Sequence, residues 1–371
     1  MSAEGVNNFT SLILNQLYAS QSAAGSVILS GISLYLFMGA IDFGLKGRSH
    51  DQLSRFLNGD FEERCSGNWR HSYTATKWID LKRLSEKIST SNAALFYSCH
   101  LYNHYQKISK IFNLNRIKMD ISNPVGSAYQ MNEWVSKNTI QSYRNIFDES
   151  MLVPTKMIFV HSLSFRPDWK SHFESELTKQ EIFLNDKGQP ISVAMMNQEV
   201  NESIYDLPDS NFRIHFKPLN HKHYFTAVVL PKEGHIVGEV LKNFKLDQMY
   251  KYFEESRSKY IKVKMPKFKI SSRIDLVETF KYYGVTDIFD ETRSNFGRMT
   301  NETVCIGNLI QVVNVDIDDV NVKAVTTETK KVELLSPSDE FYVTRPFLFF
   351  VYISSAKVVL ISAVVTHPNA S

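Results

Sequence analysis

The chain has 371 residues, of which 43% are hydrophobic and 22% are charged. This composition supplies ample apolar material for a folded core and excludes a disordered chain. The net charge of +3 is too small to demand a nucleic acid or a membrane as a partner. Cys65, Cys99 and Cys305 lie far apart without a C-x-x-C spacing, so we expect free thiols and neither a zinc site nor a thioredoxin-type redox motif.

The first third of the chain has mainly helical patterns. Residues 1–18 predict an amphipathic helix, and because no basic region precedes an apolar run there, we expect no cleavable signal peptide. The apolar residues of that helix are Phe9, Leu12, Ile13, Leu14 and Leu17. Residues 26–41 are apolar but too short for a membrane span, so they predict a buried helix. Residues 129–146 predict a second amphipathic helix.

From residue 157 onward the pattern becomes that of strands. β-branched and aromatic runs are bounded there by Pro, Gly, Asn or Lys, as strands are. These runs lie at residues 156–165, 224–231, 260–270, 308–317 and 347–365, the last of which predicts a hairpin of two core strands. Helical patterns interleave near 237–254 and 273–284, and no Pro/Gly/Ser-rich linker divides the chain. We therefore expect a single α+β domain over residues 1–371 with large sheets.

The sequence contains none of the common catalytic or cofactor-binding motifs that we compared it with. H-E-x-x-H, G-x-S-x-G, the P-loop and G-x-G-x-x-G are all missing from the sequence, so we expect no enzymatic activity and no cofactor. His221-Lys222-His223 lacks a nearby carboxylate and predicts a solvated loop rather than a metal site. A row of lysines in strand-like sequence fits either a solvated, edge-protecting face, which we favour, or a basic stripe for a sulfated polysaccharide. The row consists of Lys259, Lys262, Lys264, Lys267 and Lys269.

The most informative stretch lies near the C-terminus, over residues 313–350. A strand-like run leads into about twenty residues with almost no large apolar side chains. The chain then meets Leu334, Leu335 and a Ser-Pro pair, and re-enters the core at Arg345-Pro346-Phe347. A structureless segment of this length inside a compact domain is uncommon and is usually functional or disordered.

This segment resembles the reactive-centre loop of the serpins, and short matches in the family's order extend the resemblance from about residue 8 to 368. The matching segments include Ser26–Leu34, Asn92–Phe96, Asn132–Val135, Phe165–Trp169, Met195–Gln198, Val229–Lys232, Met265–Lys269 and Gly284–Phe289. The resemblance implies a serpin fold with three β-sheets and about eight to nine helices. The hinge and the exposed reactive-centre loop together would span residues 319–345. The blood-fluke serpins are the subgroup that we suggest.

The resemblance also implies a gate of buried polar groups, the family's shutter, which holds two central strands together. Ser30 and Ser33 fall at its serines, His161 at its usual asparagine and Gln311 at its usual histidine. The imidazole and the amide have exchanged places, which keeps a donor and acceptor pair under the sheet. The alternative is two unrelated strand residues. Trp169 falls at the family's tryptophan near the top of these strands, the breach.

Aligned without gaps, the loop places the reactive bond at Leu335–Ser336. Leu334 and Lys331 are the alternative reactive residues; Lys331 would shorten the inserted strand by about 13 Å at roughly 3.3 Å per residue. Family members insert the cut loop as an extra strand, so alternate loop residues must become buried. The hinge would be Asn321, Val322, Lys323, Ala324, Val325 and Thr326, and the buried set Val322, Ala324, Thr326, Glu328, Lys330 and Val332.

The hinge departs from the family pattern in its charge. Asn321 replaces the usual glycine and Lys323 the usual glutamate, while Glu328 and Lys330 would both turn inward. A buried ion pair often fails to recover its desolvation cost. The resemblance as a whole implies an inhibitor that acts as a suicide substrate for serine proteases. The charged hinge favours the alternative, a non-inhibitory carrier or chaperone-like serpin.

The predicted partner is a serine protease that accepts an apolar side chain before the cut bond. Leu335 fits a chymotrypsin-like, cathepsin G-like or elastase-like protease, whereas Lys331 would fit a trypsin-like one. We expect a monomer with no nucleic-acid partner and no membrane span. By resemblance the protein is extracellular or at the cell surface, and a cytoplasmic location is the alternative because no cleavable signal peptide is predicted.

Overall fold

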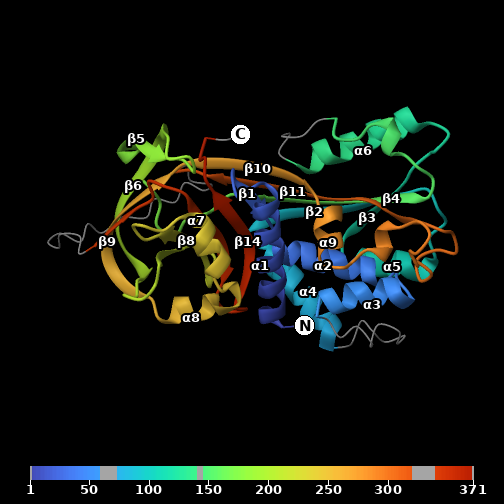
Figure 1. Cartoon of the computed structure of the whole chain (residues 1–371), viewed down its shortest axis with the longest axis horizontal. Coiled ribbons are helices and arrows are strands. Elements are labelled where there is room, and N and C mark those ends of the chain that lie inside the picture. Colours follow the sequence, from blue (N-terminus) through green and yellow to red (C-terminus); the bar gives the residue numbers. More distant parts are fainter. Residues whose placement is uncertain (1, 59–72, 140–144, 320–338, 370–371) are drawn as a thin grey trace. The chain divides into compact units, whose positions relative to one another are not determined.

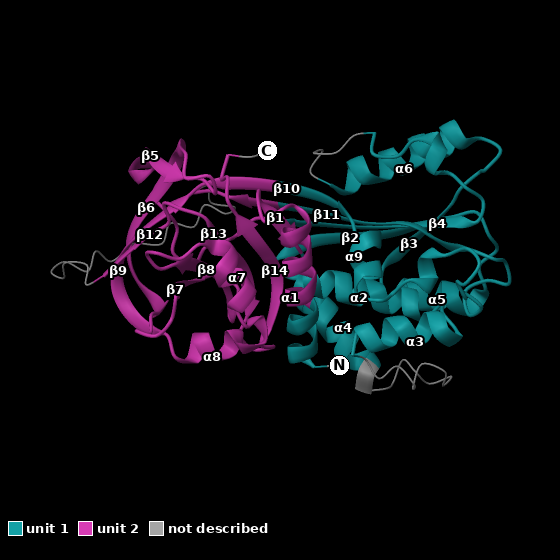
Figure 2. Cartoon of the chain, viewed as in Figure 1, with its two compact units in different colours: residues 1–9, 30–165, 271–314 teal, residues 10–29, 166–270, 315–371 magenta. Residues whose placement is uncertain are grey.

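The structure is a computed structural model that describes residues 2–58, 73–139, 145–319 and 339–369 (Figure 1). These residues form two compact units (Figure 2). Unit 1 comprises residues 1–9, 30–165 and 271–314, and unit 2 comprises residues 10–29, 166–270 and 315–371. Each unit is assembled from three separate stretches of sequence. The single domain over 1–371 stays a prediction.

A five-stranded sheet forms the centre of unit 1. Its strands follow the order β10-β11-β4-β2-β3. They are β2 (Ser89–Tyr97), β3 (Leu114–Lys118), β4 (Lys156–Phe165), β10 (Phe268–Asp275) and β11 (Cys305–Ile317). β4 and β11 are direct neighbours, and the Cys305 backbone N–H donates to Thr155 O where both strands begin. They therefore run parallel, and a parallel pair is slightly less stable per residue than an antiparallel pair.

Both faces of this sheet are covered, which explains why its central strands β4 and β11 are buried without alternation. In Figure 1, α6 lies on one side of the strands and α2 to α5 lie on the other. Ile158, Val160, Ile310 and Val312 pack with α6, while their neighbours Phe159 and His161 contact Phe37 of α2. The helices are α2 (Gly31–Asp42), α3 (Gly47–Phe56), α4 (Tyr73–Glu86), α5 (Asn103–Ile111), α6 (Pro124–Asn138) and α9 (Val277–Tyr282).

Helices α2 and α4 approach closely at Gly39, where the Trp78 indole lies against the glycine. A Cβ at position 39 would lie 1.8 Å from the nearest Trp78 ring atom, so the ring must move. We expect Gly39→Ala to lower the free energy of unfolding by about 2 kcal/mol, measured by urea denaturation. Gly5→Ala is the matched control: its Cβ meets nothing closer than 3.4 Å, and alanine in a helix gains about 0.5–1 kcal/mol. Equal stability of both variants would contradict this packing.

Unit 2 contains a nine-stranded network of hydrogen-bonded strands. Its main path is β1-β14-β13-β8-β7-β6-β9-β12, and β5 joins at β6. The strands are β1 (Val27–Leu29), β5 (Lys179–Leu184), β6 (Pro190–Tyr205), β7 (Phe212–Pro218), β8 (Tyr224–Pro231), β9 (Arg257–Pro266), β12 (Asp339–Tyr342), β13 (Phe347–Ile353) and β14 (Val358–Val365). The 16-residue β6 pairs with β5, β7 and β9, so two of the three expected sheets are continuous through it. Helices α7 (Val237–Asn243) and α8 (Met249–Glu254) complete the unit.

Three predicted elements have other boundaries in the structure. Residues 27–29 form strand β1 instead of the first turn of a helix, because they pair with β14. The helix predicted over 129–146 begins at Pro124, after Asn123 caps it by accepting the Gly126 N–H, and it ends at Asn138. The predicted N-terminal helix is α1 (Ala3–Ser20), with Phe9, Ile13, Leu14 and Leu17 buried and Leu12 exposed.

The α+β class is confirmed, and the described residues contain nine α-helices. None of these helices, within the part of the chain that the structure describes, is long and apolar enough to cross a membrane. Cys99 and Cys305 are buried free thiols, as predicted, and Cys65 lies outside the described residues.

Candidate functional site

The segment predicted to carry the reactive bond lies outside the described residues. This applies to the hinge residues 321–326 and to Lys331, Leu334, Leu335 and Ser336. The residues on either side are described: β11 leads to Asp318 and Asp319, and the chain resumes at Asp339 in β12. The site can therefore be built from its two ends and from the strands beside them.

The first end of the segment is held by charged and aromatic contacts. Trp169 Nε1 donates to Asp318 O at 3.2 Å, and Arg166 pairs with the Asp318 carboxylate. Asp319 is 4% exposed; it accepts from Lys267 Nζ at 2.6 Å and from Thr178 Oγ1 at 2.7 Å. Burial alone would raise the pKa of Asp319, but these hydrogen bonds outweigh burial and lower that pKa below its ordinary value. The ionised carboxylate thus fixes the point where the chain leaves β11.

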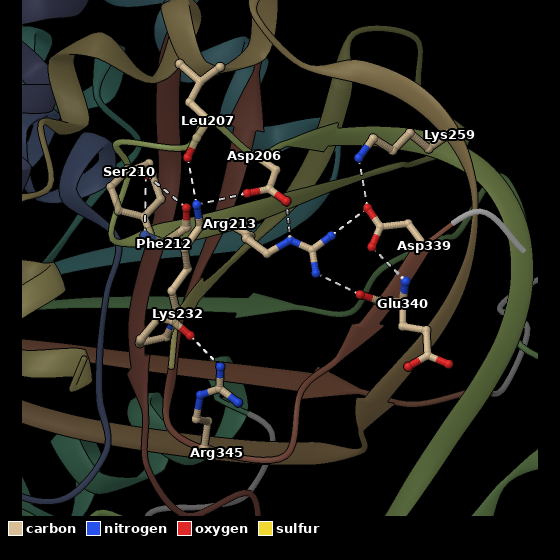
Figure 3. Close-up of polar contacts among 11 residues, drawn as sticks. Asp206, Leu207, Ser210, Phe212, Arg213, Lys232, Lys259, Asp339, Glu340 and Arg345 are labelled. Carbon is tan, nitrogen blue, oxygen red and sulfur yellow. Dashed lines mark hydrogen bonds and ion pairs between the residues drawn. The ribbon is translucent and has the colours of Figure 1, made fainter. Parts of the chain in front are cut away.

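The second end is held by Arg213 (Figure 3). Its guanidinium pairs with Asp206 at 2.9 Å and Asp339 at 2.7 Å, and donates to Glu340 O at 2.8 Å. Lys259 Nζ also pairs with Asp339, at 2.9 Å. Burial raises the pKa of Asp339, whereas hydrogen bonds from Lys259 and Arg213 lower it, and the net direction is downward. The planar fork of arginine suits such multiple contacts.

Backbone pairing and a buried ring secure the same end. β12 pairs in parallel with β9 from Asp339 opposite Ile261 to Tyr342 opposite Lys264. Phe341 is fully buried, and Val343 N–H donates to Lys264 O at 2.9 Å. Four residues of pairing alone would make a weak edge strand, so the buried Phe341 ring and the Arg213 contacts add to what keeps β12 in place.

The four residues predicted for the shutter lie together in unit 1. The Gln311 side-chain amide clamps the Ser30 backbone: Oε1 accepts from Ser30 N–H and Nε2 donates to Ser30 O, both at 3.1 Å. Ser30 Oγ donates to Ser33 Oγ at 2.9 Å. Gln311 Nε2 lies 3.4 Å from His161 Nδ1, and His161 Nε2 lies 2.9 Å from Ser91 Oγ. The exchanged imidazole and amide are therefore neighbours under the sheet.

This polar group is arranged as two halves with one long contact between them. Gln311 on β11 is satisfied by Ser30, and His161 on β4 is satisfied by Ser91 of β2. Separating β4 from β11 would break the 3.4 Å contact between Gln311 and His161 while leaving each side chain another partner. Burial lowers the pKa of His161 to about 4, so this side chain is neutral near pH 7 and carries no charge into the seam.

Sequence reasoning missed the residues that hold the two ends of the segment. Arg166, Arg213 and Asp339 were not predicted as site residues, and Lys259 and Lys267 were assigned to a solvated row of lysines. In the structure Lys259, Lys264 and Lys267 pair with Asp339, Glu181 and Asp319 respectively. The segment between residues 320 and 338 has a carboxylate residue at each end, and these carboxylates were the signal that could have pointed to cationic partners.

Comparison with known proteins places the chain in a family. The family model described as "Serpin (serine protease inhibitor)" matches residues 4–368. Iripin-1 of Ixodes ricinus is 25% identical over 352 residues, which cover 93% of this chain and 89% of that protein. Serpin B4 of Homo sapiens is 24% identical over 358 residues, covering 89% of this chain and 90% of that protein.

Solved structures agree at the level of the fold. The crystal structure of native protease nexin-1 with heparin superposes with a TM-score of 0.84 at 21% identity and covers 99% of both chains. The blood-fluke subgroup stays a prediction. Because the family model spans nearly the whole sequence, the chain belongs to the serpin family.

Proposed function

We propose that this serpin inhibits serine proteases as a suicide substrate. The protease serine attacks the Leu335 carbonyl carbon, an ester to Leu335 forms, and the peptide bond to Ser336 breaks, leaving a new amino terminus at Ser336. The released segment before Leu335 then enters between β11 and β4 and carries the acylated protease with it. Insertion withdraws the ester from hydrolysis by distorting the bound protease.

The observation that carries this proposal is the arrangement of strands where the loop begins. β11 leads directly into the segment, and its neighbour β4 runs parallel to it with one long side-chain contact between the two gate residues. A loop that folds back beside β11 would be antiparallel to both strands, which replaces one parallel pairing with two antiparallel ones. The contacts at Asp318 and Asp319 set the point from which it would fold back.

A progress curve of protease activity tests the proposal. Cathepsin G, chymotrypsin and an elastase are incubated with increasing amounts of the protein, and residual activity is followed with a small substrate. Suicide inhibition predicts time-dependent loss of activity that does not return on dilution, at about one inhibitor per protease. Activity that recovers fully on dilution would contradict it.

The non-inhibitory alternative rests on the charged loop. Lys323 departs from the usual hinge residue, and insertion would place the charged Glu328 and Lys330 on the inner face, where a buried strand tolerates charge poorly. A carrier or chaperone-like serpin would be cut as an ordinary substrate and leave the protease active. The same progress curves distinguish it from the inhibitor, because the protease would turn over many copies of the chain.

The target specificity is set by Leu335 under this proposal. We expect mass spectrometry of the fragment released from the protease complex to show Ser336 as its first residue. Leu335→Arg should replace inhibition of chymotrypsin-like proteases with inhibition of trypsin, because an arginine reaches the acidic pocket that rejects leucine. Leu334→Arg is the matched control and should not make the protein a trypsin inhibitor. A fragment that begins at Val332 would instead assign the bond to Lys331 and a trypsin-like target.

A sulfated polysaccharide is the weaker partner proposal. Protease nexin-1, one of the similar structures, was solved with heparin. In this chain three of the five lysines of the proposed stripe are already paired with carboxylates, which lowers the net charge that the stripe presents. We also propose an extracellular location for this protein, because a secreted target protease would be found there.

A further inference from the structure

Three ionisable side chains lie buried together in unit 2, on the neighbouring strands β6 and β7. Glu202 is 5% exposed, and His215 and Lys217 are each 1% exposed. The Glu202 carboxylate takes one partner on each oxygen: His215 Nε2 at 2.5 Å and Lys217 Nζ at 3.1 Å. Lys217 Nζ also donates to Gln198 Oε1 at 2.6 Å. We call Glu202, His215 and Lys217 the buried triad.

The triad touches the first end of the reactive segment through Trp169. Lys217 Nζ lies 4.6 Å from the Phe173 ring centroid and 5.5 Å from that of Trp169. Trp169, in turn, donates to Asp318 O. Gln198 completes this connection, because its Nε2 donates to His172 O at 2.8 Å and so holds the chain between the two aromatic residues. A cation over two ring faces is an attractive contact that strengthens where water is excluded.

The triad touches the second end through Phe341. The His215 ring lies 5.4 Å from the Phe341 ring, centroid to centroid, and Phe341 is the buried residue of β12. Arg213 covers Phe341 as well, with its guanidinium carbon 5.6 Å from the ring centroid. The triad therefore contacts residues that fix both ends of the segment 320–338.

The triad brings the Glu202 carboxylate into direct contact with the Lys217 amine. Burial raises the pKa of Glu202, but the charge of Lys217 and the hydrogen bond from His215 outweigh burial, so that pKa lies below its ordinary value. Burial lowers the pKa of Lys217 and the Glu202 carboxylate raises it; burial is the larger effect, so the net direction is downward. Arg213, which lies on β7 with His215 and Lys217, is already paired with Asp206 and Asp339. His172 contributes its backbone carbonyl.

Neutralising Glu202 would leave a buried ammonium without a counterion. Removing one partner of a buried pair is strongly destabilising, whereas replacing the whole group by apolar residues of similar volume is often neutral. Because the pKa of Glu202 is lowered in the folded state, its contribution to stability is present above the ordinary carboxyl pKa and is lost as the pH falls through the folded value.

We propose that Glu202, His215 and Lys217 form a buried, paired lock that positions both ends of the reactive segment at once, so that a charge left without its partner in this lock releases Asp318–Asp319 and β12 together. The effect of the lock on inhibition rests on the proposed function. The effect of the lock on the two ends of the segment does not rest on the proposed function, because the two ends can be observed without any protease.

Hydrogen–deuterium exchange of the full chain at pH 7.4 tests the lock. Glu202→Gln keeps the shape of the side chain and removes its charge. We expect protection of the amides at 318–319 and 339–342 to fall at least tenfold, at both ends, while β2 amides in unit 1 keep theirs. Glu181→Gln is the matched control: it removes a carboxylate paired with Lys264 at 25% side-chain exposure, and it should leave both ends unchanged.

A rescue variant separates a charge effect from lost packing. Glu202→Leu/His215→Leu/Lys217→Met removes every charge of the triad, and we expect protection at both ends to return to within threefold of the parent. Should Glu202→Gln give no soluble protein, Lys217→Met takes its place with the same expected joint loss. The lock would be overturned if protection fell at one end only or stayed unchanged in the single variant. It would also be overturned if the triple variant were as poorly protected at both ends as the single variant. If the parent inhibits no protease but the exchange results hold, the proposed function fails and the lock stands.

Discussion

Cleavage of the loop between residues 323 and 335 is expected to raise the melting temperature of the protein by about 10 °C. The inserted strand would bury Val322, Ala324, Thr326 and Val332, and a fully buried valine contributes about 1.5–3 kcal/mol. A gain of roughly 5 kcal/mol corresponds to this shift at about 2 °C per kcal/mol for a chain of this size. Scanning calorimetry of intact and cleaved protein measures it.

The calorimetric comparison needs proof that the loop alone was cut. Mass spectrometry of the cleaved sample provides it, and protein incubated with protease that has been inactivated beforehand is the control. A melting temperature that stays within 2 °C after verified cleavage would show that the loop does not insert, and would favour the carrier or chaperone-like function over inhibition.

Replacing Val322 with arginine is expected to abolish inhibition while leaving the intact fold unchanged. Position 322 is the first of the inward-facing set, so insertion would bury a charge without a partner. Such burial costs several kcal/mol, which is enough to slow insertion below the rate at which the protease hydrolyses its acyl-enzyme. The variant should be cut as a substrate, and the number of inhibitor molecules consumed per protease should rise at least tenfold.

Val325→Arg is the matched control for this variant. It introduces the same side chain three residues along, at a position that the alternation places on the outer face of the inserted strand. It should inhibit nearly as well as the parent. If Val322→Arg inhibits as well as Val325→Arg, the loop register is wrong and with it the assignment of Leu335.

Much of the fold could be predicted because it follows from local patterns and family order. The apolar strands of 156–165, 308–317 and 347–365 lie where their β-branched runs predict, since both of their faces are buried. The boundaries of helices and strands were less predictable where pairing with a segment distant in sequence determines them. Residues 27–29 are apolar enough for either a helix or a strand, and pairing with β14 selects the strand.

Buried charge was the feature that sequence patterns could not reveal. In β7, Phe212, Ile214 and Phe216 alternate with Arg213, His215 and Lys217, a pattern typical of a strand with one solvated face. The structure buries His215 and Lys217 as well, because Glu202 on β6 and the rings of Trp169 and Phe173 meet them from other segments. Such compensation depends on residues distant in sequence, as do the ion pairs of Asp319 with Lys267 and of Asp339 with Arg213.

A denaturing gel tests the central claim most directly. The protein is mixed with cathepsin G or chymotrypsin at neutral pH, and the mixture is boiled in detergent before electrophoresis. Suicide inhibition predicts a band near the summed masses of the protease and the chain less its C-terminal fragment, and blocking the nucleophilic serine of the protease beforehand should prevent that band. Complete conversion to cleaved chain with free, active protease and no such band would contradict the account.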